Sequence, residues 1–201
     1  MFISFDGLDG VGKSTQIRLL CDWLTGRGLE VATCRDPGTT QLGEALRDII
    51  LAGSAGATGT RCEMLLYMAA RAQLVEEFIA PTLAAGKVVV SDRFLLSNVV
   101  YQGYGSGLDV DALWQIGSIA CNELLPTVSI VLDMDQQQAA ARLNRPLDRM
   151  ESRGGEFRER IRQGFLAEAR KRPAEIIVVP ADLPVPEVHA QIIAAIESRL
   201  D

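Results

Sequence analysis

A glycine-rich segment near the start of the chain follows an apolar run and precedes a helical pattern. The run is Phe2-Ile-Ser-Phe-Asp6, and the segment reads Gly7-Leu-Asp-Gly-Val-Gly12-Lys13-Ser14-Thr15. A strand, a Gly-x-x-x-x-Gly-Lys-Ser loop and a helix in this order are typical of a phosphate-binding P-loop. The alternative is a glycine-rich turn that happens to precede a helix, but the spacing, the Lys-Ser pair and the flanking pattern all favour the P-loop.

This loop predicts a site for a nucleoside triphosphate. Gly7 and Gly12 permit the tight backbone path, so that N–H groups and the positive end of the following helix surround the phosphates. Lys13 is expected to reach the β- and γ-phosphates, and Ser14 to bind Mg²⁺. The predicted nucleotide-binding residues here are Gly7, Leu8, Asp9, Gly10, Val11, Gly12, Lys13, Ser14 and Thr15.

Composition limits the classes of protein to which this chain can belong. The 201 residues fit one α/β domain, 1–201, and the net charge of −6 argues against nucleic-acid binding. No apolar span approaches the length of a membrane helix, and a P-loop starting at residue 7 leaves no room for a signal peptide. The cysteines are scattered without a metal-binding spacing, which predicts reduced, mostly buried thiols and a cytoplasmic location: Cys21, Cys34, Cys62 and Cys121.

Short apolar runs alternate with helical patterns along the chain. Strands are predicted over 1–5, 30–35, 87–91, 127–132 and 175–179, and helices over 13–26, 40–52, 61–85, 109–124, 155–171 and 186–200. The runs are apolar on both faces, as in a buried parallel sheet. The pattern predicts a doubly wound, three-layer α/β fold with about five parallel strands.

Arginines crowd into one region late in the chain: Arg142, Arg145, Arg149, Arg153, Arg158, Arg160 and Arg162. The stretch 142–155 is broken by Pro146 and ends in two glycines, so it is predicted to be an arginine-rich lid. For Arg158 to Arg162 we expect a solvated, salt-bridged helix face instead.

Charged residues follow the predicted strands, where ligands of open α/β sheets bind. Asp92 ends an apolar strand in the manner of a Walker-B carboxylate, so Ser14 and Asp92 are the predicted metal ligands. Asp133 ends another strand in the same way and is the alternative. Arg93 is expected to contact a phosphate, or else to form a simple ion pair. The chain contains no Asn-Lys-x-Asp sequence, the guanine-reading element of GTPases.

At these residues the chain resembles the thymidylate kinase family. The most specific stretch is Ser91-Asp-Arg-Phe-x-x-Ser97-x-x-x-Tyr101-Gln-Gly103, and the other matching motifs are Arg35-Asp-Pro-Gly-Thr39, Glu44-x-x-Arg47, Leu65 to Gln73 and Leu147-Asp-Arg149-Met-Glu151. Asp36 and Phe94 stand where the family motifs have Glu and Tyr. The resemblance implies a five-stranded P-loop fold, ATP with Mg²⁺ as cofactors, phosphorylation of dTMP to dTDP, and a homodimer.

The resemblance also implies substrate-binding residues: Asp9, Asp36, Arg47, Tyr67, Arg71, Arg93, Ser97, Asn98, Tyr101 and Gln102. Arg47 and Arg93 would clamp the dTMP phosphate, and Asp9 would accept from the 3′-hydroxyl. Tyr67 would stack on thymine and Arg71 would donate to a base carbonyl. Ser97, Asn98 and Gln102 would read the remaining base edge, and Tyr101 would favour deoxyribose.

Plainer roles remain open for three of these residues. Arg71 could form a surface ion pair with Glu76. Tyr67 could be core packing, and Tyr101 a core residue whose hydroxyl finds a backbone partner.

The resemblance implies a catalytic arginine from the lid. Some thymidylate kinases carry a P-loop arginine where this chain has Gly10, and in the others the lid supplies it. We expect Arg149, and after it Arg142 or Arg145, to approach the ATP phosphates, which can contribute about 10³–10⁵-fold in rate. The predicted catalytic residues are thus Asp9, Lys13, Arg93 and Arg149.

Two other functions are compatible with a P-loop. One is a kinase of the same fold that acts on another nucleoside monophosphate. The other is a nucleotide-dependent switch, which would have no need of the second phosphate clamp at Arg47 and Arg93.

Overall fold

The predicted strands form one parallel sheet. The computed structural model describes residues 1–52, 58–143, 154–197 and 199. The strands are β1 (Phe2–Gly7), β2 (Val31–Arg35), β3 (Val88–Asp92), β4 (Val128–Asp133) and β5 (Ile176–Pro180). They pair in parallel in the order β2-β3-β1-β4-β5. This confirms the predicted doubly wound architecture.

Burial on both faces explains why the strands read as continuous apolar runs. Successive side chains of a strand point to opposite faces of the sheet. In β3 the neighbours Val89 and Val90 are both fully buried, and Val90 pairs with Ile3 of β1, which is also fully buried. A sheet with both faces covered needs apolar residues at every such position.

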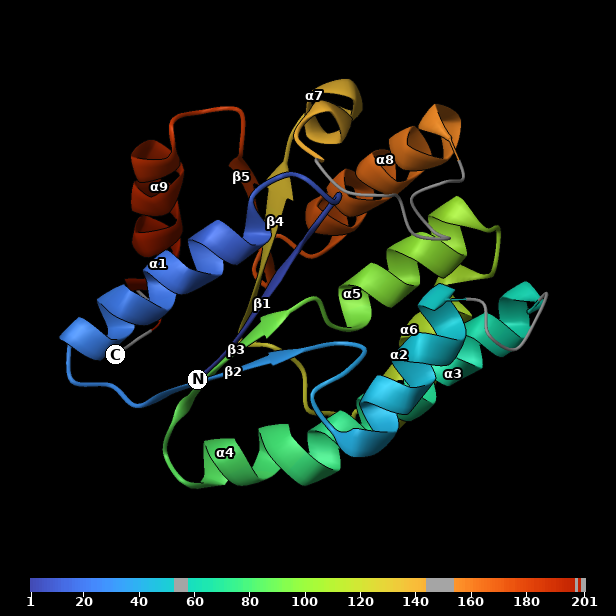
Figure 1. The fold of residues 1–201 in the computed structure, drawn as a ribbon, viewed down its shortest axis with the longest axis horizontal. Coiled ribbons are helices and arrows are strands. Elements are labelled where there is room, and N and C mark those ends of the chain that lie inside the picture. The colour runs from blue at the N-terminus through green and yellow to red at the C-terminus, as the bar shows by residue number, and fades with distance from the viewer. Residues whose placement is uncertain (53–57, 144–153, 198, 200–201) are drawn as a thin grey trace.

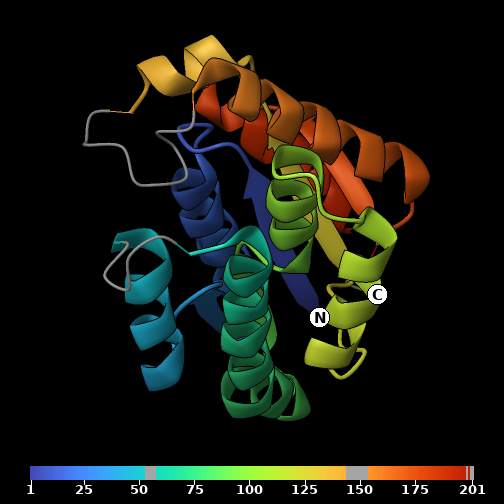
Figure 2. The ribbon, with the colours of Figure 1, turned by 90° about the vertical axis from the view of Figure 1, so that its right-hand side faces the viewer.

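Helices cover the two faces of this sheet. The structure contains α1 (Lys13–Gly26), α2 (Gln41–Ala52), α3 (Thr60–Leu74), η1 (Val75–Ile79), α4 (Ala80–Ala84), α5 (Leu95–Asn98), η2 (Val99–Gly105), α6 (Val110–Ala120), α7 (Gln136–Ala141), α8 (Gly155–Lys171) and α9 (Val185–Glu197). Helices α1 and α9 pack together on one side of the sheet, and α5 and α8 lie on the other (Figure 1). Helix α3 packs against both α2 and α6, and these three helices face the viewer in Figure 2.

The sequence patterns missed two helical segments. One is α5 with η2, over residues 95–105, a helix that continues into π-helical turns. Its valines and two glycines have low helix propensity, so its sequence does not indicate a helix. The other is α7, whose six residues are too few for a periodic pattern. A local signal for α7 does exist, because Asp135 caps it by accepting from the backbone N–H groups of Gln137 and Gln138.

The sheet topology places the glycine-rich loop at a switch point. Strand β1 is the central strand: β3 and β2 extend the sheet on one side of it, and β4 and β5 extend it on the other. Ligands of doubly wound sheets bind at such a crevice, beyond the carboxyl ends of the strands. Within the described residues, no helix has the length and apolar character needed to cross a membrane.

Candidate active site

At two positions of the P-loop, glycine is required both by a positive φ and by a close contact with the backbone. Gly7 has a φ of 127°, and a β-carbon there would lie 2.5 Å from the carbonyl oxygen of Leu132. Gly10 has a φ of 89°, and its β-carbon would lie 2.1 Å from the carbonyl oxygen of Ala139. In this conformation no side chain fits at position 10, so an arginine there would require the loop or α7 to move.

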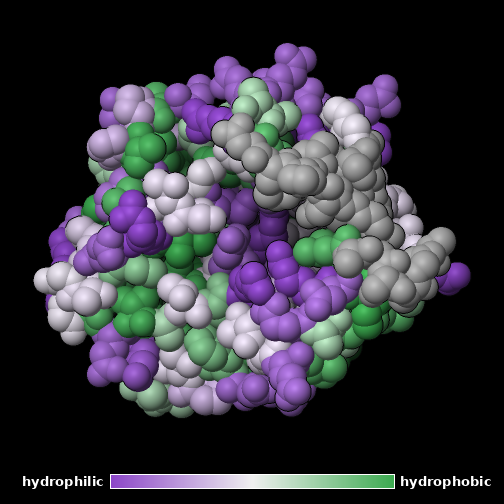
Figure 3. Space-filling view, in the orientation of Figure 1, coloured by the Kyte–Doolittle hydropathy of each residue, from purple (hydrophilic) through white to green (hydrophobic). Residues whose placement is uncertain are grey.

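Lys13 lies against its own loop. Its ammonium donates to the carbonyl oxygen of Leu8 over 2.8 Å and lies 3.5 Å from Oδ1 of Asp9. Burial lowers the pKa of Lys13, and nearby Arg93 lowers it further. The surrounding hollow, which we call the Lys13 pocket, is lined by Asp9, Gly10, Gly12, Lys13, Ser14, Thr15, Arg35, Asp36, Arg47, Asp92, Arg93 and Leu143. Figure 3 shows a central hollow lined by hydrophilic residues on the face seen in Figure 1.

The structure distinguishes the two candidate metal carboxylates. Asp133 is held by Arg162, whose Nε and Nη2 donate to its two oxygens over 2.7 and 2.9 Å. Asp92 instead lines the Lys13 pocket beside Ser14, and its buried Oδ1 has no hydrogen-bond partner among the residues that the structure describes. A buried carboxylate oxygen next to a hydroxyl suits a hard cation such as Mg²⁺. The geometry therefore favours Asp92 over Asp133.

Arg93 is fixed by contacts from three sides. Its guanidinium donates to Oδ1 of Asp9 over 2.7 Å, to the carbonyl oxygen of Gly7 over 2.9 Å and to Oγ of Ser97 over 3.1 Å. A longer contact of 3.4 Å reaches the hydroxyl of Tyr101. The backbone of Arg93 has a φ of 68°, in the left-handed region that a non-glycine residue seldom adopts. Such strain at a pocket wall is typical of functional positions.

The predicted substrate-binding residues gather around a second pocket. This Arg71 pocket is lined by Asp9, Asp36, Pro37, Arg47, Leu51, Tyr67, Arg71, Arg93, Phe94, Ser97, Asn98, Tyr101 and Gln102. It contains all the residues implied by the resemblance, and their role in binding stays a prediction. The predicted set left out three apolar residues that line the pocket, Pro37, Leu51 and Phe94. Pro37 and Phe94 lie within the matching motifs, whereas Leu51 lies in none of them.

A chain of buried polar side chains forms the floor of the Arg71 pocket. Arg71 donates to Oδ2 of Asp36 over 2.6 Å and to Oδ1 of Asn98 over 3.0 Å. Asn98 then donates to Gln102 over 2.7 Å, and Gln102 donates to Glu63 over 3.0 Å. All five side chains are buried. The alternative of a surface ion pair between Arg71 and Glu76 is therefore wrong.

Tyr67 and Tyr101 are only half-buried, and both line the Arg71 pocket. The alternative for Tyr101 was a core residue whose hydroxyl bonds to a backbone group. Its hydroxyl instead accepts a long hydrogen bond from the side chain of Arg93. Burial raises the pKa of Tyr101, so its hydroxyl stays protonated at neutral pH.

The structure describes only the two ends of the predicted lid, 142–155. Arg145 and Arg149 lie outside the described residues, as does most of 142–155. Arg142 donates to the carbonyl oxygen of Ala181 over 3.3 Å. It lines a further hollow, the Arg142 pocket, with Gly10, Val11, Gly12, Thr15, Gln16, Ala181, Asp182, Leu183, Pro184, Val185 and Val188. The sequence analysis did not predict a role for the loop after β5. Its position after a parallel strand nevertheless places it at the edge of the sheet where ligands bind.

The full-length similarity of this chain to known proteins identifies its family. The family model described as thymidylate kinase matches residues 5–192. The chain belongs to the thymidylate kinase family. It is 43% identical to thymidylate kinase of Rhodopirellula baltica over 97% of this chain and 79% of that relative, and 42% identical to that of Pelotomaculum thermopropionicum over 100% and 94%. The crystal structure of thymidylate kinase from Ehrlichia chaffeensis has the same fold, with a TM-score of 0.80, 30% identity and 98% coverage of both chains.

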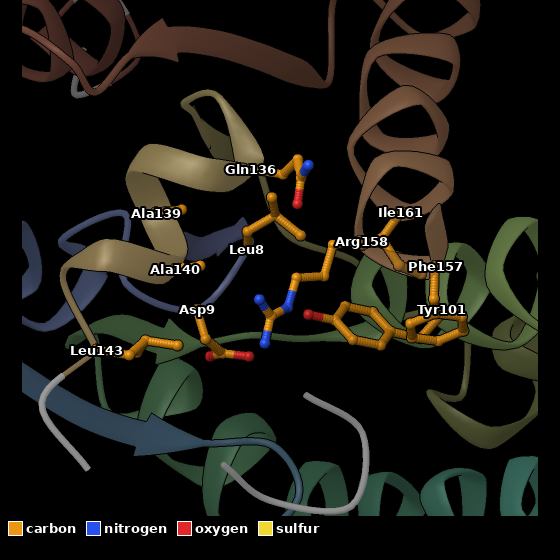
Figure 4. A pocket seen from close by; sticks show the side chains of 10 residues that line it. All are labelled: Leu8, Asp9, Tyr101, Gln136, Ala139, Ala140, Leu143, Phe157, Arg158 and Ile161. Carbon is orange, nitrogen blue, oxygen red and sulfur yellow. The ribbon is translucent and has the colours of Figure 1, made fainter. Parts of the chain in front are cut away.

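One arginine lies elsewhere than the sequence predicts for this thymidylate kinase family member. Arg160 is exposed and Arg162 forms its ion pair with Asp133, as expected for a salt-bridged face. Arg158 is half-buried and points into a small cavity, the Arg158 pocket, so its expected place on a solvated face is wrong (Figure 4). The cavity is lined by Leu8, Asp9, Tyr101, Gln136, Ala139, Ala140, Leu143, Phe157, Arg158 and Ile161. The helical turn that begins α8 directs Arg158 inward beside buried Phe157.

Proposed function

We propose that ATP with Mg²⁺ binds in the Lys13 pocket, that dTMP binds in the Arg71 pocket, and that the γ-phosphoryl group passes between them beside Asp9. Membership of its family makes this protein a thymidylate kinase, which phosphorylates dTMP to dTDP for dTTP synthesis. The observation that carries the two-pocket proposal is that Asp9 and Arg93 line both pockets. Donor and acceptor phosphates bound in them would therefore meet at one point.

The donor side offers what a triphosphate requires. The N-terminus of α1 and the loop N–H groups face the phosphates, and Lys13 adds a charge. Ser14 and Asp92 would hold Mg²⁺, which when bound neutralises charge on the phosphate oxygens. The Arg142 pocket shares Gly10, Gly12 and Thr15 with the Lys13 pocket, and its apolar wall suits the nucleoside part of ATP.

The acceptor side supplies charge for one phosphate and polar groups for one base. Arg47 donates to the carbonyl oxygen of Pro37 over 2.9 Å, which holds it at the mouth of the pocket near Arg93. Two guanidinium groups suit the dTMP phosphate. Arg71 and its partners Asn98 and Gln102 offer donors and acceptors to the base edge, with Tyr67 beside them.

The reaction needs little covalent chemistry from the protein. A dTMP phosphate oxygen is already anionic near neutral pH, so no strong general base is required. Asp9, Lys13 and Arg93 would align the two nucleotides and stabilise the charge on the transferred group. The predicted lid arginine Arg149 would add to this charge.

We also propose that the protein is a homodimer through α2, α3 and α6. These helices carry large apolar side chains that face solvent in the single chain: Leu65 is 54% exposed and Ile119 is 81% exposed. Exposed apolar groups on adjoining helices are typical of subunit interfaces. Sedimentation velocity should give twice the chain mass, and Ile119→Asp should shift it toward the monomer.

A cytoplasmic location completes the proposal. All four cysteines are free thiols, as predicted. Cys34 and Cys121 are buried, Cys21 is half-buried and Cys62 is exposed. Free, unpaired thiols are typical of a reducing compartment.

The decisive experiment measures ADP release with ATP·Mg²⁺ and a panel of dTMP, dUMP, UMP, dCMP, dAMP and dGMP. A strong preference for dTMP in kcat/KM supports the proposal. Preference for another monophosphate would overturn the assignment of the Arg71 pocket to thymine. ADP release that is indifferent to every acceptor would favour a nucleotide-dependent switch.

A further inference from the structure

Arg158 occupies a position that its sequence context does not explain. It lies in the first turn of α8, which begins at Gly155. The N–H groups at a helix start carry partial positive charge, so an arginine there is electrostatically disfavoured. Further along the same helix, Arg160 donates to the carbonyl oxygen of Gly105 and Arg162 to the carboxylate of Asp133.

The Arg158 side chain points at the junction of the two proposed substrate pockets. In Figure 4 its guanidinium extends across the cavity toward the Asp9 carboxylate and the Tyr101 hydroxyl. Asp9 lines the Lys13, Arg71 and Arg158 pockets alike. Arg158 therefore borders the place where donor and acceptor phosphates would meet.

Cationic side chains from separate parts of the chain face Asp9. Arg93 lies 2.7 Å and Lys13 lies 3.5 Å from Oδ1 of Asp9. Arg158 approaches the same carboxylate from α8, an element that supplies neither of those cations. An anionic ligand at this junction would therefore meet cationic side chains from three parts of the chain: Lys13, Arg93 and Arg158.

The walls of the Arg158 pocket strengthen the field of that charge. Leu8, Phe157 and Ile161 are buried apolar residues that line it. Apolar walls lower the local dielectric constant, so a fixed guanidinium interacts more strongly with a developing charge than it would in water.

We propose that Arg158 is a catalytic residue that contacts the phosphoryl group in transit. This inference rests on the proposed function. In the step, an oxygen of the dTMP phosphate forms a bond to the γ-phosphorus, the bond from that phosphorus to the β,γ-bridging oxygen breaks, and ADP leaves with the electron pair. Arg158 donates hydrogen bonds to the transferred group throughout and keeps its proton.

The first test compares kinetics of Arg158→Ala, Arg158→Gln and Arg158→Lys with the wild type. Arg160→Ala is the matched control, because Arg160 lies two residues further along the same helix and is exposed. We expect kcat to fall at least about 100-fold in Arg158→Ala, with KM for ATP and dTMP changed only a few-fold. Arg158→Lys should retain part of the rate, and Arg160→Ala should stay within about threefold of the wild type.

A second test separates a catalytic role from a structural one. Added guanidinium ion should restore part of the activity of Arg158→Ala but not that of a variant that is merely unfolded. Calorimetry should show that Arg158→Gln binds dTMP alone normally, yet binds the combination of ADP, aluminium fluoride and dTMP about 100-fold more weakly.

Two results overturn the inference in distinguishable ways. An active wild type with Arg158→Ala within about threefold of it would dismiss Arg158 and leave the proposed function standing. Equal loss of dTMP binding and of the ADP–aluminium fluoride–dTMP complex would make Arg158 structural. A wild type that does not phosphorylate dTMP would remove the proposed function, and the inference with it.

Discussion

Arg71 donates to Asp36 over 2.6 Å, and both side chains are buried. The pair joins α3 to the loop after β2, beneath the pocket that we assign to dTMP. Burial raises the pKa of Asp36, and Arg71 opposes that effect. The ion pair therefore both holds the pocket together and keeps Arg71 pointing into it.

Removal of Arg71 alone should destabilise the protein strongly. Arg71→Met leaves Asp36 buried without a cation, and breaking such a pair costs about 3–5 kcal/mol. Urea unfolding of Arg71→Met, Asp36→Asn and the double variant should show that the double variant loses less than the sum of the single ones. Arg18→Ala, which removes a highly exposed partner of Asp22, is the control and should change the free energy of unfolding by less than about 0.5 kcal/mol. A cost below about 1 kcal/mol for Arg71→Met would show that the pair is not structural.

Ser97 should act on the phosphate clamp more than on the base. Its hydroxyl donates to Oδ1 of Asp6 over 2.6 Å and accepts from Arg93 over 3.1 Å, so its hydrogen bonds are already used within the protein. In Ser97→Ala we expect kcat/KM for dTMP and for dUMP to fall equally, by about tenfold for one lost hydrogen bond.

Ser4→Ala provides the control for Ser97, because Ser4 also donates to Asp6 but does not contact Arg93. It should leave both substrates nearly unaffected. A change of more than about fivefold in the dTMP to dUMP ratio of Ser97→Ala would restore the predicted role in reading the base edge.

Asp92 should govern the dependence of the reaction on Mg²⁺. Its buried Oδ1 lacks a partner among the described residues, whereas Asp133 is satisfied by Arg162. Titration of activity with Mg²⁺ should show that Asp92→Asn needs at least about tenfold more metal than the wild type, since ligand-shell changes cost about 10–100-fold in affinity. Asp133→Asn should leave that requirement unchanged. If the two variants behave alike, Asp92 does not hold the metal.

Local sequence predicts this fold well because the three central strands β3, β1 and β4 are buried on both faces. The apolar runs that end at Asp92 and Asp133 are typical of strands in such a sheet, and the P-loop glycines mark the switch point. The short segments α5 with η2 and α7 are different. Their helicity depends on packing against α6 and α8, so their own residues carry little periodic signal.

The candidate site was predictable as a set of residues but not as a set of contacts. Motifs indicated Arg71, Ser97 and Asp92, yet nothing in their spacing shows that Arg71 faces Asp36. Nor does any pattern separate Arg158 from Arg160, because the two differ only in where the first turn of α8 directs them. Side-chain direction at a helix start is set by tertiary packing, here by buried Phe157.

Glu168 should couple the stability of the protein to acid pH. It is 1% exposed and accepts from Tyr104 over 2.6 Å, from Trp114 over 2.8 Å and from Lys171 over 2.8 Å. These contacts join η2 and α6 to α8. Burial by itself would raise the pKa of Glu168, but the hydrogen bonds from Lys171, Tyr104 and Trp114 together lower it below its ordinary value of 4.5.

A carboxyl group with a lowered pKa in the folded state stabilises the protein above its unfolded pKa, and that contribution is lost as the pH falls through the folded value. Glu168→Gln should therefore be less stable than the wild type at pH 7, by about 1–3 kcal/mol, because its amide cannot accept from all three donors. Urea unfolding from pH 7 down to pH 3.5 should show this difference shrinking below pH 4.5. Glu175→Gln, at an exposed partner of Arg172, should show no such trend. A difference between wild type and Glu168→Gln that stays constant over this range would mean that the carboxylate charge of Glu168 does not contribute to stability.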